Sequence, residues 1–191
     1  MKTILLFPLT LVSLLLPILF ALPRTPSSPQ AAAPFISKLF RQDHVTTKVP
    51  DSCPVTKPPA HPFLPPSSYP NQTGPDHFAF GTNKLWTTLG SDGTWHHLPK
   101  WPDGSYRQKL LWWSEGYDLQ HNNQPPLKLS GERLDSSAPP LTSDEHANLG
   151  RTNDQRHPFI VSAINMSTLG CWKITGQLED AKLTFVVWVT Q

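Results

Sequence analysis

Histidine side chains are the first candidates for chemistry in this chain, because metal binding would use them. His96 and His97 are the only adjacent pair among the eight histidines. Neighbouring residues on a strand point to opposite sides, so this pair does not converge on one metal ion. No histidine follows Cys171, which excludes the copper site of a cupredoxin. We therefore expect no metal site and no cofactor.

Carboxylates are the second candidates, and four of them lie in the long polar segment 135–158: Asp135, Asp144, Glu145 and Asp154. Paired carboxylates carry out glycoside hydrolysis, so a hydrolase of the cell envelope that uses Asp135 and Glu145 is the alternative function. Charged loops are common without any catalytic role, and no Gly-x-Ser-x-Gly turn is present. The main expectation is a non-catalytic protein.

Aromatic residues gather near predicted turns, and the set is Trp95, Trp101, Trp112, Trp113 and Tyr117. Trp112 and Trp113 are adjacent on a predicted strand, so one ring enters the core and the other faces outward or covers an edge. An exposed tryptophan beside a tyrosine can stack on a sugar ring or anchor a protein. Trp112, Trp113 and Tyr117 are therefore candidate ligand-binding residues for a glycan or an envelope protein. The alternative is packing beneath a loop, because large aromatic side chains are mostly buried.

The chain has two cysteines, Cys53 and Cys171. An even number of cysteines in an exported chain predicts a disulfide. A bridge between these two would close a loop of more than a hundred residues, for which chain entropy predicts about 4–5 kcal/mol of stabilisation. Two buried free thiols are the alternative.

The N-terminus indicates the compartment. Lys2 precedes a leucine-rich run from residue 3 to residue 21 that carries no charge, which is typical of a secretory signal peptide. An uncleaved membrane anchor is the alternative for residues 1–21, because the run nearly spans a bilayer. We expect an exported protein of the cell envelope or the extracellular space, with membrane contact only through this segment.

The overall charge argues against a nucleic-acid partner. Sixteen lysines and arginines face fourteen acidic residues, for a formal net charge of +2. The basic residues do not form a cluster longer than one or two, and nucleic-acid binding requires such a patch. We therefore exclude nucleic acid as a partner.

The prolines divide the chain into two parts. Thirteen of the twenty-two lie in residues 22–75, and so many prolines prevent a regular helix or a central strand. Residues 22–75 are therefore predicted to be an extended spacer that Cys53 ties to the rest of the protein. All seven tryptophans follow, and residues 76–191 are the predicted folded domain.

Short runs of β-branched and aromatic residues in the domain predict strands. Eight runs fit: 77–80, 84–89, 94–98, 106–113, 127–134, 159–165, 169–175 and 182–190. This spacing indicates an all-β, immunoglobulin-like antiparallel β-sandwich. Glycine-containing turns predict hairpins at residues 90–93 and 176–181, and the segment 135–158 is predicted to be an exposed flap.

Alternation along the last two predicted strands indicates which side chains face the core. Leu183, Phe185, Val187 and Val189 share one apolar face, which belongs in the core. In the preceding strand Trp172 and Ile174 share a side, so Cys171 points outward. A spacer segment that carries Cys53 can then lie across the outer face of the sheet.

Several motifs, in this order, resemble a group of uncharacterised bacterial exported proteins, some of them lipid-anchored. The motifs are CPVT at 53–56, KLWTTL at 84–89, KLLWW at 109–113, GERLD at 131–135, APPL at 138–141, GCWKITG at 170–176 and LTFV at 183–186. Members of the group carry a proline before Gly-Cys-Trp and an acidic residue after it, where this chain has Leu169 and Lys173. The resemblance implies an exported β-domain and supports pairing of Cys53 with Cys171. It implies no catalytic residue.

Overall fold

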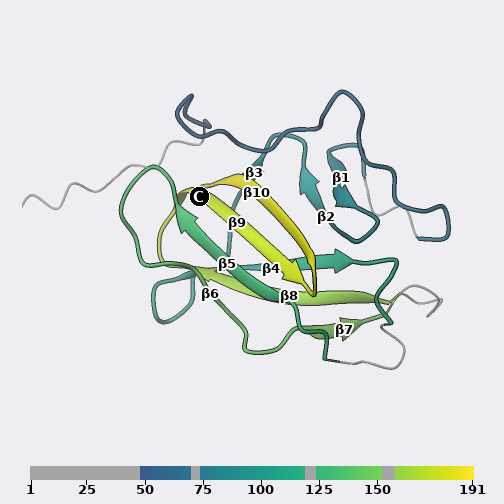
Figure 1. Ribbon diagram of the computed structural model, residues 1–191. Helices are drawn as coiled ribbons and strands as arrows, with labels where there is room; N and C mark the ends of the chain where they lie inside the picture. Colours follow the sequence, from purple (N-terminus) through teal and green to yellow (C-terminus); the bar gives the residue numbers. More distant parts are fainter. Residues whose placement is uncertain (1–47, 70–73, 119–123, 152–157) are drawn as a thin grey trace, which may run out of the picture. The chain divides into compact units, whose positions relative to one another are not determined.

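The computed structural model describes residues 48–69, 74–118, 124–151 and 158–191. The predicted signal peptide, residues 1–21, lies outside them, and the extents of the spacer and of the domain stay predictions. The described residues form ten strands and no helix (Figure 1), and within them no helix is long and apolar enough to cross a membrane. The strands are β1 (His77–Thr82), β2 (Leu85–Gly90), β3 (Thr94–Trp95), β4 (Tyr106–Trp113), β5 (Lys128–Arg133), β6 (Thr142–Ser143), β7 (Asn148–Gly150), β8 (Phe159–Met166), β9 (Gly170–Leu178) and β10 (Ala181–Val189).

The strands form two sheets. The first has the order β1-β2-β4-β8-β6, with β7 also paired to β8, and the second has the order β3-β10-β9-β5. Every pairing is antiparallel except the short parallel one between β3 and β10. The all-β prediction is therefore confirmed, with two mostly antiparallel sheets of the β-sandwich kind.

The main hydrophobic core contains side chains of both sheets. Trp112 of β4 and Phe185 of β10 have ring centroids 6.1 Å apart, and the Trp112 indole nitrogen donates a hydrogen bond to the Ser162 hydroxyl (2.9 Å). The indole also lies against β9 at Gly176, where an added Cβ would come within 2.5 Å of the ring. A glycine at this position lets the large Trp112 side chain reach the opposite sheet.

The β9–β10 hairpin is confirmed, with a turn at Glu179 and Asp180 that is tighter than predicted. The predicted inward set of β10 belongs to the core, and so do Trp172 and Ile174 of β9. Cys171 lies in a separate cluster with Cys53 and Trp188. Alternation along these strands therefore predicted the two faces correctly.

The hairpin predicted at residues 90–93 is wrong. Gly93 does form a turn, with a positive φ of 72°, but β3 leaves the first sheet and pairs with β10 instead of β2. The Gly93 carbonyl accepts a hydrogen bond from the backbone N–H of Trp188 (2.9 Å), and the Trp95 carbonyl accepts one from Thr190 (3.0 Å). The edge of β10 thus provides β3 with the backbone hydrogen-bond partners that the predicted hairpin would have taken from β2.

The segment predicted as an exposed flap over 135–158 is exposed at most of its described residues, but it is tied to the first sheet. β6 and β7 both pair with β8, and Leu141 and Ala147 are buried in the core. The pairing with β8 holds this polar segment on the first sheet, and the Leu141 N–H also donates a hydrogen bond to the Gly131 carbonyl of β5 (3.2 Å) in the second sheet.

Candidate functional site

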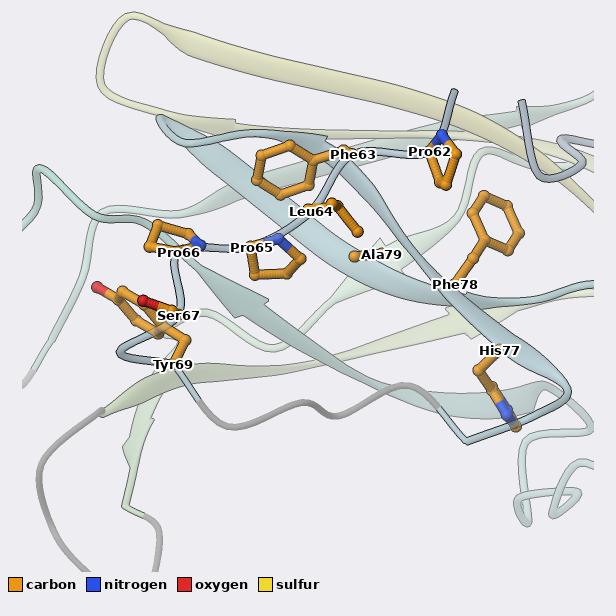
Figure 2. Close-up of a pocket in the computed structure, with 10 residues that line it drawn as sticks. All are labelled: Pro62, Phe63, Leu64, Pro65, Pro66, Ser67, Tyr69, His77, Phe78 and Ala79. Carbon is orange, nitrogen blue, oxygen red and sulfur yellow. The ribbon is translucent and has the colours of Figure 1, made fainter. Parts of the chain in front are cut away.

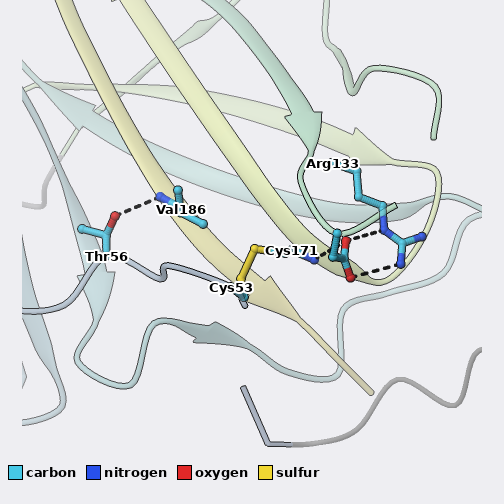
Figure 3. The surroundings of a disulfide bond; sticks show 6 residues. Cys53, Thr56, Arg133, Cys171 and Val186 are labelled. Carbon is cyan, nitrogen blue, oxygen red and sulfur yellow. Dashed lines mark hydrogen bonds and ion pairs between the residues drawn. A yellow bond between two sulfur atoms is a disulfide. The ribbon is translucent and has the colours of Figure 1, made fainter. Parts of the chain in front are cut away.

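A disulfide joins Cys53 to Cys171 of β9 across 118 residues of sequence, with Cα atoms 5.7 Å apart (Figure 3). Both cysteines are buried, and Trp188, Val49, Val55 and Val186 pack around them. The predicted bridge is confirmed, on the outer face of the second sheet. It fixes the second half of the proline-rich segment to β9, in the central strand pair of this sheet.

The backbone beside this bridge is held by a partly buried ion pair (Figure 3). Asp135 accepts a hydrogen bond from the Arg133 Nε (2.7 Å) and another from the Cys171 N–H (3.1 Å). Burial opposes ionisation of Asp135, but these hydrogen bonds and the Arg133 charge outweigh it and lower the pKa of the carboxyl. Asp135 is thus an ionised structural group at neutral pH.

The three described carboxylates of the predicted hydrolase set do not share a partner. Asp135 is held by Arg133, Asp144 is held by Arg107, and the Glu145 side chain is 89 % exposed. Asp154 lies outside the described residues. No group of three metal-ligating side chains occurs in the part of the chain that the structure describes. The contacts described for Asp135, Asp144 and Glu145 do not favour the hydrolase alternative.

The predicted ligand-binding aromatics occupy three different environments. Trp112 is fully buried between the sheets, Trp113 is 2 % exposed on the opposite face of the first sheet, and Tyr117 is half-buried against the core. The adjacent tryptophans do point to opposite faces, as strand geometry requires. Neither indole, however, is open to a ligand. Trp112 is buried in the core, and residues of the predicted spacer help to cover Trp113.

Residues 62–69 of the predicted spacer pack on the outer face of the first sheet. Phe63 and Tyr69 contact the Trp86 ring, with centroids 5.7 and 5.0 Å apart, and Trp86 stacks on Trp113 at 6.4 Å. The Tyr69 hydroxyl donates a hydrogen bond to the Ser114 carbonyl (3.3 Å). This aromatic cluster fixes a segment that has no strand partner of its own.

A groove of about 500 Å³ lies between this segment and β1 (Figure 2). Its residues come from two short stretches of chain, 62–69 and 77–79, and the lining side chains are those of Pro62, Phe63, Leu64, Pro65, Pro66, Ser67, Tyr69, His77, Phe78 and Ala79. The volume falls within the usual range of ligand sites, about 300–1,000 Å³. Leu64 is 79 % exposed at this groove, so the site presents apolar surface to solvent.

A second surface feature surrounds Trp101, which is 47 % exposed and is the most exposed tryptophan of the chain. The Arg107 guanidinium lies 4.7 Å from the centroid of the Trp101 ring. Asp144 accepts two hydrogen bonds from Arg107, at 2.8 and 2.7 Å. The ring is therefore held in place on a polar surface.

Sequence reasoning missed both surface features. Trp101 was in the aromatic set, and its position between prolines and glycine in Pro99-Lys100-Trp101-Pro102-Asp103-Gly104 was a signal that it sits on a turn. No feature of the sequence indicated the groove. A proline-rich segment that packs on a sheet has the same composition as an extended linker exposed to solvent.

Comparison with known proteins leaves the resemblance to bacterial exported proteins as a prediction. No protein-family model, no curated protein and no solved structure matches this chain.

Proposed function

We propose that this protein is an exported, non-catalytic binding module of the cell envelope or extracellular space, and that the groove at β1 receives an extended segment of a partner protein. The leader-like residues 1–21 and the disulfide support export, because structural disulfides persist in oxidising compartments. The observation that carries the binding proposal is the groove itself.

We propose further that the fold is of the immunoglobulin-like type. Strand order supports this, since β2-β4-β8-β6 has the sequence order of strands A, B, E and D, and β10-β9-β5 has that of G, F and C. The disulfide differs from the usual one, because Cys171 on the F-like strand bonds to the segment before the sandwich. The bridge thus fixes the chain ahead of the groove-forming residues 62–69, and it does not join the two sheets.

The chemistry of the groove favours an extended peptide. Among the described residues β1 pairs on one side only, with β2, and a free strand edge offers backbone donors and acceptors to an added strand. The facing wall contains Pro62, Pro65 and Pro66, which have no N–H to compete for the peptide backbone. Alternate side chains of a bound strand would enter the apolar hollow.

The groove is also prepared for binding before a partner arrives. Phe63 and Tyr69 hold its outer wall on Trp86, and Phe78 and Ala79 in its other wall are buried in the sheet. A rigid site avoids the entropy of ordering a loop on association, which otherwise weakens binding.

The test is selection of peptides from a phage-displayed library on the disulfide-intact protein, followed by measurement of their Kd. We expect selected peptides with alternating apolar residues, and hydrogen exchange that slows in β1 when they bind. Leu64→Asp should weaken binding by about tenfold or more, because it places a charge in an apolar site. Leu134→Asp is the matched control, because Leu134 is also an exposed leucine and does not line the groove.

Equal affinity of the selected peptides for the wild type and for Leu64→Asp would contradict the proposal. So would the absence of any enriched peptide in repeated selections.

A further inference from the structure

We propose that the surface around Trp101 is a second binding site, separate from the groove, and that it takes a neutral carbohydrate. Trp101 and Asp103 belong to one loop before β4, whereas the groove is built from residues 62–69 and from β1. A sugar ring has apolar C–H faces and polar hydroxyl edges, so an exposed aromatic ring beside a polar hollow suits it.

The Trp101 loop is rigid. The Trp101 backbone N–H donates to the Ser105 carbonyl and its carbonyl accepts from Gly104, both at 2.8 Å, and the Arg107 N–H donates to the Pro99 carbonyl (3.0 Å). The Arg107 guanidinium also lies over one face of the ring, 4.7 Å from its centroid, so a ligand would stack on the other face. An indole that is 47 % exposed is thereby presented to solvent in a fixed position, which lowers the entropy lost when a ligand stacks on it.

A polar hollow of about 320 Å³ adjoins this loop. Its polar groups come from the loop, from β6 and from the end of β8, and they are Asp103, Ser105, Thr142, Asn165 and Ser167. Asn165 accepts a hydrogen bond from Arg107 (3.3 Å), so the same guanidinium contacts the Trp101 ring and the wall of the hollow. These carboxylate, amide and hydroxyl groups can pair with sugar hydroxyls.

Ser167 is the most informative of these groups. Its hydroxyl oxygen is buried and has no hydrogen-bond partner within the described residues, and buried polar atoms without a partner are rare because each costs about 1–3 kcal/mol. Ser167 lines the first hollow and also a second one of about 280 Å³ that contains Lys100 and Tyr106. Rotation of the Ser167 side chain about χ1 would turn this oxygen toward the hollows, where a ligand hydroxyl would satisfy it. The two hollows would hold neighbouring sugar units.

The charges of the site favour a neutral sugar over an acidic one. Arg107 is paired with Asp144, and Arg133 in the lining of the second hollow is paired with Asp135. The Lys100 ammonium lies 5.7 Å from the centroid of the Tyr106 ring. Hydrogen bonds from the Ser105 hydroxyl and N–H lower the pKa of Asp103, so this carboxylate is a permanent acceptor at neutral pH. With both signs of charge present, a uronic acid gains little attraction.

The experiment measures binding of cellohexaose, maltohexaose and chitohexaose to the full chain by calorimetry, with hexagalacturonate as the acidic comparison. We expect at least one neutral oligosaccharide to bind more tightly than hexagalacturonate. Trp101→Ala should weaken that binding about tenfold or more, as for an aromatic anchor, whereas Trp101→Phe should recover most of it. Leu64→Asp should bind the sugar as the wild type does, which separates this site from the groove.

Ser167→Ala provides a readout that a merely structural residue would not give. We expect weaker sugar binding with an unchanged or higher Tm, because the substitution removes a buried hydroxyl without a partner. The proposal is overturned if no neutral oligosaccharide binds at concentrations up to about 10 mM. It is also overturned if hexagalacturonate binds best, or if Trp101→Ala and Ser167→Ala both bind like the wild type.

Discussion

Thr56 and Val186 exchange two hydrogen bonds across 130 residues of sequence. The Thr56 N–H donates to the Val186 carbonyl (2.8 Å). The Val186 N–H donates to the Thr56 hydroxyl oxygen (2.9 Å), the bond drawn in Figure 3. β3 pairs with β10 only at Trp188 and Val189. Thr56 therefore continues the cover on the same edge of β10, where an unpaired strand edge would otherwise face solvent.

Thr56→Val should lower the free energy of unfolding by about 1–3 kcal/mol, because it leaves the partly buried Val186 N–H without an acceptor. Urea denaturation measures this loss, and hydrogen exchange should become faster at the Val186 amide. Thr56→Ser keeps the hydroxyl and is the control. Equal stability of the two variants would show that the hydroxyl does not hold the segment on β10.

Replacing both Cys53 and Cys171 by serine should lower the free energy of unfolding by about 2–5 kcal/mol, because the bridge closes a long loop in the unfolded chain. Urea denaturation with and without reductant measures the effect. Reductant should destabilise the wild type by a similar amount and leave the double variant unchanged. The bridge is not formed in solution if reductant leaves the unfolding free energy of the wild type unchanged, even when the reductant is added to the fully unfolded protein.

Gly176→Ala should destabilise the protein by about 1–3 kcal/mol, because the new methyl group would overlap the Trp112 ring that crosses between the sheets. Near-ultraviolet circular dichroism should change as the indole shifts. Gly116→Ala is the matched control, since an added Cβ there meets nothing within 4 Å. If the two alanine variants unfold at the same urea concentration, the indole does not pack against Gly176 as described.

Asp135→Asn should make the protein less dependent on pH in acid. The pKa of Asp135 is lower in the folded state than its usual value, so its ionisation stabilises the fold above the unfolded pKa of about 3.9. That contribution is lost as the pH falls through the lower, folded pKa. Unfolding free energies measured from about pH 2 to pH 6 should fall steeply for the wild type and less steeply for the variant.

Asp180→Asn is the comparison for this pH experiment. Lys84 lowers the pKa of Asp180, but both side chains of this pair are largely exposed, and exposed pairs contribute little to stability. In acid, the unfolding free energy of Asp180→Asn should depend on pH as that of the wild type does. If Asp135→Asn also shows the wild-type pH dependence, the pKa of Asp135 is the same in the folded and unfolded states.

The sequence was sufficient to predict eight of the ten strands and the faces of the last two. The eight predicted runs each contain a strand, because β-branched and aromatic residues suit a pleated, partly buried surface. The strands β6 and β7, of two and three residues, were not predicted, because such short strands show no period. The inward positions of Leu183, Phe185, Val187 and Val189 follow from the two-residue period of a strand. The position of Cys171 on the outer face follows from the same period.

Strand partners and surface shape could not be predicted in this way. The turn at Gly93 fits both a hairpin and a crossing to β10, and only the hydrogen bonds of the distant Trp188 and Thr190 decide between them. The burial of Trp113 likewise depends on Phe63 and Tyr69 of a segment that has no strand pattern. Local periodicity contains no information about such long-range contacts.

The disulfide also determines how the protein would respond to a mechanical load. A pull applied to the residues before Cys53 and to Gln191 passes through the sulfur–sulfur bond into β9, so residues 54–170 lie outside the loaded path. Beyond the bridge, only the stretch from Trp172 to Gln191 can be extended, to a length of at most roughly 70 Å at about 3.3–3.6 Å per residue. Under oxidising conditions, tension on the N-terminal segment would leave the segment that forms the groove and the Trp101 loop unstretched.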